Sequence, residues 1–162
     1  MVAHQEIHGK VGCGCDNTSE TKVFHWMVSY VAGSHFEVKR QYKPGILGVG
    51  GGQLSVDMAV IDTNSHEAVL FVEIDGGHHF KREFFSSTKR NSTPEHDLKK
   101  EKLGVPMLRV EQRTVEKWRM PLVEWLQTKI DLVTSGNFDS SVCCYSDGKH
   151  YETGLYATLR GV

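Results

Sequence analysis

Two of the most apolar stretches in this sequence each contain an acidic residue. Asp57 lies within 54–61, and Glu73 lies within 68–74, with Asp75 directly after it. Both stretches have the length of a strand, and the second is apolar enough to be buried on both faces and therefore central in a sheet. A carboxylate inside a buried strand is costly unless it is paired or bound to a cation. The chain must therefore fold so that these charges are compensated.

The other expected elements follow from the spacing of apolar residues and from helix-end signals. Val23, Met27 and Val31 recur on one face of a helix, and Thr93-Pro94 has the N-cap and first-turn proline of a helix start. The expected order is helix, three strands, helix, strand, helix. These elements are predicted over 17–32, 35–42, 54–61, 68–74, 93–103, 105–110 and 121–133.

This order predicts an α/β fold with a central mixed sheet flanked by helices. The helix before Gly104 is long enough to be a crossover between two parallel strands. Residues 1–162 are interpreted as a single domain with a core over about 17–133. A C-terminal extension over about 138–160 is expected to form a hairpin that turns at Asp147-Gly148. The glycine-rich segment 43–52 is expected to be flexible, and 80–94 to be a mobile loop or a poorly formed helix.

Composition narrows the class of protein. With 162 residues and a net charge of −1, the chain is a globular protein without the strong positive field of a nonspecific nucleic-acid binder. Nucleic-acid affinity would then come from local patches and from metal ions that offset phosphate charge. The first residues lack a basic region followed by an apolar run, and no apolar stretch is long enough to span a membrane. We therefore expect an intracellular protein with no membrane partner.

The four cysteines form two close pairs, Cys13-x-Cys15 and Cys143-Cys144. In a reducing compartment they are free thiols or metal ligands before they are disulfides. A structural Zn²⁺ site joining both pairs, with a histidine replacing one ligand, is the alternative to free thiols. Neither pair has the two-residue spacing usual in zinc sites, so free thiols are the favoured interpretation.

The acidic strand residues suit a catalytic cation. Asp57 and Glu73, with Asp75 as a third candidate ligand, would meet at one end of a hairpin and offer oxygen ligands to Mg²⁺, for which Mn²⁺ can substitute. Such an ion promotes hydrolysis of phosphodiesters. His79 follows at the rim of the sheet, where an imidazole can act as a general acid or base near neutral pH. Asp97 lies on the next helix.

Several segments in order resemble a known family. They are Phe36-Glu37-Val38-Lys39-Arg40-Gln41, then Val56-Asp57, then Glu73-Ile74-Asp75-Gly76-Gly77-His78-His79, then Asp97-x-x-Lys100-x-x-Leu103-Gly104-Val105-Pro106-Met107-Leu108-Arg109. Together they resemble the very-short-patch-repair-like branch of the PD-(D/E)XK nucleases. That branch includes mismatch nicking enzymes and homing endonucleases with the signature EDxHD. The resemblance covers about residues 17–130.

The resemblance implies a restriction-endonuclease-like core, α-β-β-β-α-β-α, and a metal-dependent DNA endonuclease or nickase that is a homing or a mismatch- or site-specific enzyme. It implies catalytic roles for Glu20, Asp57, Glu73, His79 and Asp97. The general family pattern has a lysine where this chain has Asp75. That departure fits the histidine-using branch and counts against an ordinary restriction-enzyme mechanism.

Basic residues are candidates for DNA contact. The segment 80–94 interleaves lysines and arginines with phenylalanines, which suits a loop that grips phosphates and stacks rings on bases. The nucleic-acid-binding candidates are Lys39, Arg40, Lys81, Arg82, Lys89, Arg90 and Lys100. A homing enzyme also needs a long recognition site, which a homodimer or additional DNA-binding segments would provide.

Structural interpretations stay open beside these roles. Asp57 and Glu73 are alternatively a pair satisfied by the backbone or by Arg40 and Arg109. Glu20 suits a capping box with Asn17, and Asp97 suits the first turn of a helix, where the helix dipole favours negative charge.

Lys100 is expected on a solvated face rather than at a phosphate.

A second candidate function comes from the segment 73–80, which is also similar to the core of RAP domains, RNA-associated modules that share this fold. The chain would then be a non-catalytic RNA-binding module.

Overall fold

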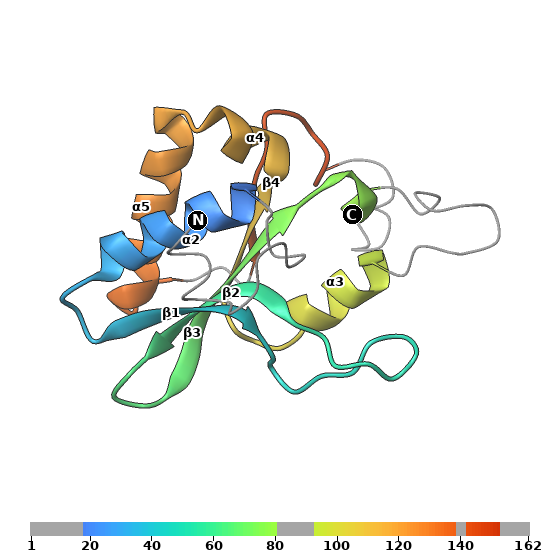
Figure 1. The fold of residues 1–162 in the computed structure, drawn as a ribbon, viewed down its shortest axis with the longest axis horizontal. Coiled ribbons are helices and arrows are strands. Elements are labelled where there is room, and N and C mark those ends of the chain that lie inside the picture. Colours follow the sequence, from blue (N-terminus) through green and yellow to red (C-terminus); the bar gives the residue numbers. More distant parts are fainter. Residues whose placement is uncertain (1–17, 81–92, 139–141, 153–162) are drawn as a thin grey trace.

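The computed structural model describes residues 18–80, 93–138 and 142–152. They form one open, mixed, five-stranded sheet in the order β1-β2-β3-β4-β5 (Figure 1). The strands are β1 (Phe36–Tyr42), β2 (Val56–Asp62), β3 (Glu67–Asp75), β4 (Met107–Glu111) and β5 (Val142–Tyr145). The first three are antiparallel neighbours, whereas β3, β4 and β5 run parallel. The expected α/β fold with a mixed sheet and a central β3 is confirmed.

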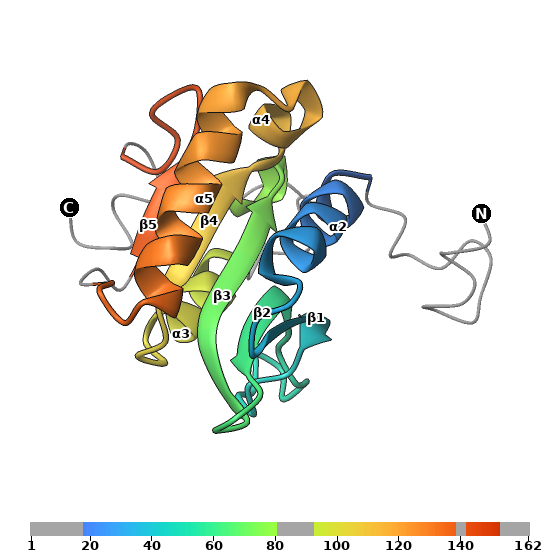
Figure 2. The same cartoon turned by 90° about the vertical axis from the view of Figure 1, so that its left-hand side faces the viewer.

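Helices cover both faces of the sheet. On one face lie α2 (Thr18–Val31) and α5 (Met120–Thr134), with the short α4 (Gln112–Lys117) at its end (Figure 2). On the other face lies α3 (Thr93–Glu101), which follows the single-turn helix η1 (Gly77–His79) in the described chain. In Figure 1 the yellow α3 stands apart from α2 and α5, across the sheet. The cover over the α3 face is therefore much thinner.

Strand alternation divides the sheet into an apolar face and a charged face. Leu70, Val72 and Ile74 of β3 and Leu108 and Val110 of β4 point to the α2 and α5 side, where they form the larger core. Each fully buried aliphatic side chain of this kind contributes roughly 1.5–3 kcal/mol. Most of the intervening residues toward α3 are buried and charged, namely Glu73, Asp75, Arg109 and Glu111, whereas Phe71 and Met107 belong to a smaller apolar core. The fold thus collects buried charge on one side of its central strands.

The C-terminal hairpin prediction overlaps the described residues mainly in its first arm. Val142–Tyr145 is a strand, and it pairs in parallel with β4 in the main sheet. The chain then turns through 146–152 and returns the buried Tyr151 to the sheet. The expected second arm continues into 153–162, outside the described residues.

Two further features differ from the sequence expectations. The helix α4 was not expected, since six residues with two buried positions, Thr114 and Val115, give too short a pattern to detect. The segment expected to be a flexible glycine-rich connection is an ordered small hairpin closed by a bridge between Leu47 and Gln53. The predictions for 81–92 and for Cys13, Cys15 and Asn17 lie outside the described residues. No helix in the described part of the chain is long and apolar enough to cross a membrane.

Candidate active site

A cavity of about 360 Å³ opens on the charged face, between the ends of β2 and β3, the helix α3 and the residues that precede β2. It is lined by Gln53, Leu54, Ser55, Asp57, Glu73, Ile74, His79, Thr93, His96, Asp97 and Lys100. Four of the five predicted catalytic residues therefore share one cavity, although they come from three separate elements and a connecting turn.

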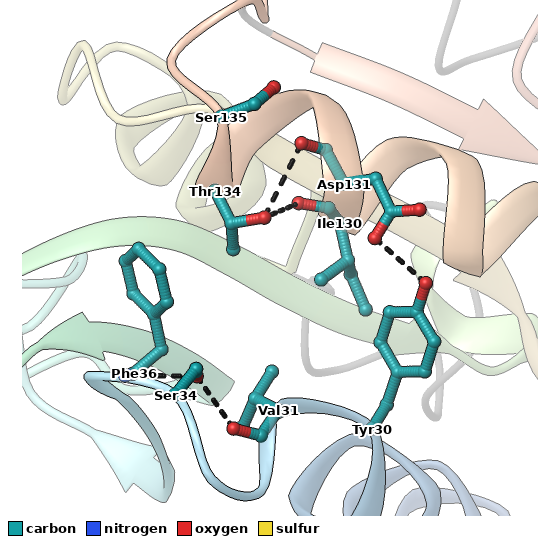
Figure 3. A pocket seen from close by; sticks show the side chains of 8 residues that line it. All are labelled: Tyr30, Val31, Ser34, Phe36, Ile130, Asp131, Thr134 and Ser135. Atoms are coloured by element: carbon teal, nitrogen blue, oxygen red, sulfur yellow. Dashed lines mark hydrogen bonds between the residues drawn. The ribbon is translucent and has the colours of Figure 1, made fainter.

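A second cavity, of about 430 Å³, lies between α2 and α5 (Figure 3). Asp131 is the ionisable acid there, and it accepts a hydrogen bond from the Tyr30 hydroxyl at 2.7 Å. The remaining lining is apolar or hydroxylic, with Val31, Phe36 and Ile130 among it. The larger cavity thus lacks the convergent charges that phosphate chemistry requires.

Asp57 is the least compensated carboxylate of the site. The hydrogen bond that the structure gives it in the described chain comes from the Ile74 backbone N–H to its Oδ2, at 2.7 Å. Burial raises its pKa well above the ordinary value, and the nearby charges of Glu73 and Glu20 raise it further. The neutral form of Asp57 is therefore favoured, and the ionised form would be favoured only with a cation nearby.

Glu73 is held by a lysine from α3. Lys100 Nζ donates to Glu73 Oε1 at 2.7 Å, and both side chains are buried. Burial raises the pKa of Glu73 even though Lys100 opposes this. Burial alone would lower the pKa of Lys100, but Glu73 outweighs it and the pKa is raised, so the ammonium keeps its charge. The solvated face expected for Lys100 is therefore wrong, because the helix turns this side chain into the cavity.

Glu20 lies in the first turn of α2 and is engaged by β1. Its Oε1 accepts from Arg40 Nη2 at 2.9 Å, from Arg40 Nε at 3.2 Å and from Gln41 Nε2 at 3.1 Å. Gln41 in turn accepts from Ser55 Oγ, and Ser55 lines the cavity. The structure brings Glu20 close enough to raise the pKa of Asp57, yet Glu20 is not among the described residues that line the cavity.

His79 ends η1 and faces two aspartates. Its Nδ1 lies 2.8 Å from Asp97 Oδ2 and 3.2 Å from Asp75 Oδ1. Burial alone would lower the pKa of His79, but Asp75 and the bonded Asp97 outweigh it, so the pKa is raised. The pKa of Asp97 is lowered to about 2, because Arg109 and His79 together outweigh the effect of burial. The aspartates orient the imidazole and help it to hold a proton.

A buried arginine joins these aspartates. Arg109 is fully buried in β4, and its Nη2 lies 2.7 Å from Asp75 Oδ1 and 2.9 Å from Asp97 Oδ2. Its Nε donates to Asp75 Oδ2, which also accepts from the Tyr151 hydroxyl at 2.8 Å. Burial and the charge of Asp75 raise the pKa of Tyr151, so its hydroxyl remains a donor. Arg109 was expected only as a partner of Asp57 or Glu73, and Tyr151 was not singled out.

One set of described residues has ligand atoms grouped closely enough for a cation, and a second set of acids lines the cavity. Asp75, His79 and Asp97 offer ligand atoms within 4.8 Å of one another, but the Arg109 guanidinium already binds both aspartates there. Both oxygens of Asp75 are engaged, which counts against its predicted part as a metal ligand. The cavity side differs. Asp97 Oδ1 is buried and lacks a hydrogen-bond partner among the described residues, and Asp57 has a backbone donor instead of a bonded cation. Asp57, Glu73 and Asp97 therefore line the same cavity, although their ligand atoms do not come as close together as those of Asp75, His79 and Asp97.

The structure decides some of the predicted DNA contacts. Arg40 is buried against Glu20, so it is not available to a phosphate, and Lys100 is occupied by Glu73 inside the cavity. Lys39 is exposed and paired with Glu37 at 3.1 Å. The other four candidates, Lys81, Arg82, Lys89 and Arg90, lie outside the described residues. Of the possible zinc ligands, Cys143 and Cys144 are half-buried free thiols on β5, and the rest of that set is not described.

No protein-family model, no curated protein and no solved structure matches this chain. Its function has to be inferred from the geometry of the cavity.

Proposed function

We propose that this chain is a metal-dependent DNA endonuclease or nickase with a restriction-endonuclease-like fold. The observation that carries the proposal is the convergence of Asp57, Glu73, His79, Asp97 and Lys100 on one cavity. Phosphodiester hydrolysis needs a cation held by oxygen ligands, a proton donor and positive charge near the phosphate. The lining offers oxygen ligands from β2 and β3, a histidine from η1 and a lysine from α3.

Asp57 and Glu73 would hold Mg²⁺ or Mn²⁺, with Asp97 Oδ1 available to a water of its shell. When bound, the ion supplies positive charge against the phosphate and makes the attacking water more acidic. Lys100 adds a second positive charge while it keeps Glu73 ionised.

His79 is the proton-transfer group in this proposal. Asp97 and Asp75 engage Nδ1, so Nε2 is the ring nitrogen that exchanges a proton with the substrate or water. The raised pKa favours the protonated ring near neutral pH, which suits a general acid that protonates the leaving oxygen. Arg109 and Tyr151 act on His79 indirectly, because they fix Asp75 and Asp97.

Nicking of supercoiled plasmid in Mg²⁺ or Mn²⁺ tests the proposal. The wild-type chain is expected to nick or linearise the plasmid, and Asp57→Asn to lose this activity while it still binds duplex DNA. Asp131→Asn, which changes an acid in the other cavity, is the matched control and should retain activity. Gel shifts on RNA and DNA complete the design. Full activity of Asp57→Asn contradicts the proposal, and so does binding of RNA with no cleavage of DNA.

A further inference from the structure

We infer that the glycine-rich loop, residues 43–55, is a DNA-contacting surface that lays Leu47 and Val49 against the duplex beside the phosphate held in the cavity. This inference rests on the proposed function, since it names how the substrate is held at the same site. In Figure 1 the turquoise loop leaves the sheet and runs beside α3.

The loop has a defined shape. Leu47 and Gln53 form an antiparallel bridge, and Leu54 N donates to Ile46 O at 2.9 Å. At the tip, Gly48 N donates to Gly52 O at 2.8 Å. A surface that is ordered before binding loses less conformational entropy when a ligand arrives. The loop is therefore suited to recognition.

The loop is seated on α3 by three contacts. His96 Nε2 accepts from the Val49 backbone N–H at 2.9 Å, and Lys99 Nζ donates to Leu47 O at 3.1 Å. At Gly48 the backbone is so close that a Cβ would lie 2.8 Å from Leu54 Cδ2 and 2.9 Å from His96 Nε2. A side chain at this position would require the Leu54 or His96 side chain to shift.

The tip presents apolar side chains to solvent. Leu47 is 57% exposed and Val49 is 58% exposed, and they are among the four exposed large hydrophobic residues of the described chain. Large apolar side chains beside a polar cavity indicate a binding surface. Two side chains are far too few for a stable protein dimer, which needs roughly 800 Å² from each partner. They suit the apolar contacts that proteins make with sugars and base edges.

Charge and continuity favour DNA as the occupant. Residues 43–55 contain a lysine and no carboxylate, and Lys99 adds a positive charge beside Leu47. The same loop continues as Gln53, Leu54 and Ser55, which form one wall of the cavity. A duplex with a phosphate beside Asp57 would therefore meet this wall first and the apolar tip next.

The test measures duplex affinity by fluorescence anisotropy in the Asp57→Asn background, with a fluorescein-labelled duplex of mixed sequence. Changing Leu47→Ser together with Val49→Ser is expected to weaken binding at least about tenfold without changing the salt dependence, because no ionic contact is lost. Val28→Ser with Met120→Ser, which changes exposed side chains on α2 and α5, is the matched control and should bind as the parent does.

A second pair of variants removes no apolar side chain. Gly48→Ala displaces the His96 ring that accepts from the Val49 N–H, and it should weaken binding by less than the double serine variant does. Gly148→Ala, outside the loop, where an added Cβ meets nothing nearer than 3.9 Å, is its control and should leave affinity unchanged. Thermal melting of each variant checks that the sheet stays folded.

The outcomes separate this inference from the proposed function. Unchanged affinity in the double serine variant overturns the inference, and it leaves the proposed function standing if the wild type nicks plasmid. The inference is also overturned if light scattering shows that the double serine variant loses dimers while its duplex affinity is unchanged. The loop would then be a contact between copies of the chain. Loop-dependent duplex binding without cleavage supports the inference and contradicts the nuclease. Absence of duplex binding in both wild type and Asp57→Asn overturns both.

Discussion

Two groups of carboxylates, buried except for the partly buried Asp57, lie side by side on the same face of the sheet, and they are compensated differently. In the Arg109 group, Asp75 and Asp97 share a fully buried guanidinium, and Asp75 has a tyrosine hydroxyl as well. In the Asp57 group, Glu73 has Lys100, whereas Asp57 has a backbone N–H. Asp97 belongs to both, with one oxygen on Arg109 and the other without a partner in the described chain.

The difference indicates which carboxylates stabilise the site and which could bind a ligand. A buried carboxylate with its cation in place contributes to a fixed geometry, and removing the cation is strongly destabilising. A buried carboxylate without one is unfavourable until a ligand supplies positive charge. The Arg109 group therefore holds His79 in position, and under the proposed function the Asp57 group is where a metal and a phosphate would bind.

The largest expected effect comes from breaking the Arg109 group. Arg109→Met should reduce the free energy of unfolding by about 3–5 kcal/mol, because Asp75 and Asp97 would stay buried without their cation. Urea unfolding at pH 7 measures this. Arg113→Met, which changes an exposed arginine on α4, should cost less than about 0.5 kcal/mol. Equal, small losses in both variants would remove the distinction between the two groups.

The next effect concerns the residue that the Arg109 group positions. His79→Gln should reduce the rate of plasmid nicking by about 10²-fold or more, because proton transfer to the leaving oxygen is lost. Its affinity for duplex DNA should change little. His25→Gln, on the exposed side of α2, is the control. Nicking at more than half the wild-type rate in His79→Gln would assign the proton transfer to another group.

The pH dependence of the free energy of unfolding tests whether Asp57 lacks a compensating charge. Its pKa is raised in the folded chain, so the stability it contributes is complete below the unfolded pKa and is lost as pH rises through the folded pKa. The asparagine of the Asp57→Asn variant resembles the neutral acid, so the variant does not lose this stability as the pH rises. In EDTA, the free energy of unfolding of the variant should exceed that of wild type by more than about 1 kcal/mol at pH 7, since a tenfold change in acidity is worth about 1.4 kcal/mol.

Denaturant titrations of the wild type and Asp57→Asn at pH 4 and pH 7 measure this difference. It should shrink as the pH falls to 4, because the folded carboxyl is neutral there and the unfolded carboxyl is about half neutral. A variant that is less stable than wild type at pH 7 would mean that Asp57 is compensated inside the chain.

The smallest expected effect is at the edge of the Arg109 group. Tyr151→Phe removes one hydrogen bond to Asp75 and should cost about 1–2 kcal/mol of stability. A few-fold loss of nicking at unchanged affinity for DNA is expected as well, because Asp75 would hold His79 less firmly. Tyr30→Phe removes the more exposed bond to Asp131 and should cost less than Tyr151→Phe does. Equal losses of stability in the two variants would show that the hydrogen bond to Asp75 gains nothing from its buried surroundings.

The sequence predicts the scaffold better than it predicts the pairing of charges. Alternation and helix-end signals place the strands and main helices, and acids in apolar strands point to Asp57 and Glu73 as members of one site. The edge strand β5 escapes prediction, since four half-buried residues have no distinctive period and their partner β4 is far away in the sequence.

The choice of partner for each charge depends on tertiary structure. Arg109 stands in register with Glu73 on β4, yet its guanidinium binds Asp75 and Asp97, and Lys100 of the crossover helix takes Glu73. The sequence contains the lysine and the arginine but not the way α3 lies across the strands. The order of the glycine-rich loop is hidden for the same reason, because His96 and Lys99 hold it from another element.

The central claim is that Asp57, and not the Arg109 group, is the acid that awaits a cation. Thermal unfolding with and without Mn²⁺ tests it most directly, because an ion that binds the folded state raises the melting temperature. Mn²⁺ is expected to raise the melting temperature of the wild type and of Tyr151→Phe, whereas Asp57→Asn should melt at a higher temperature without the ion and gain nothing from it. An equal gain in Asp57→Asn, or a gain that Tyr151→Phe loses and Asp57→Asn keeps, would contradict the account.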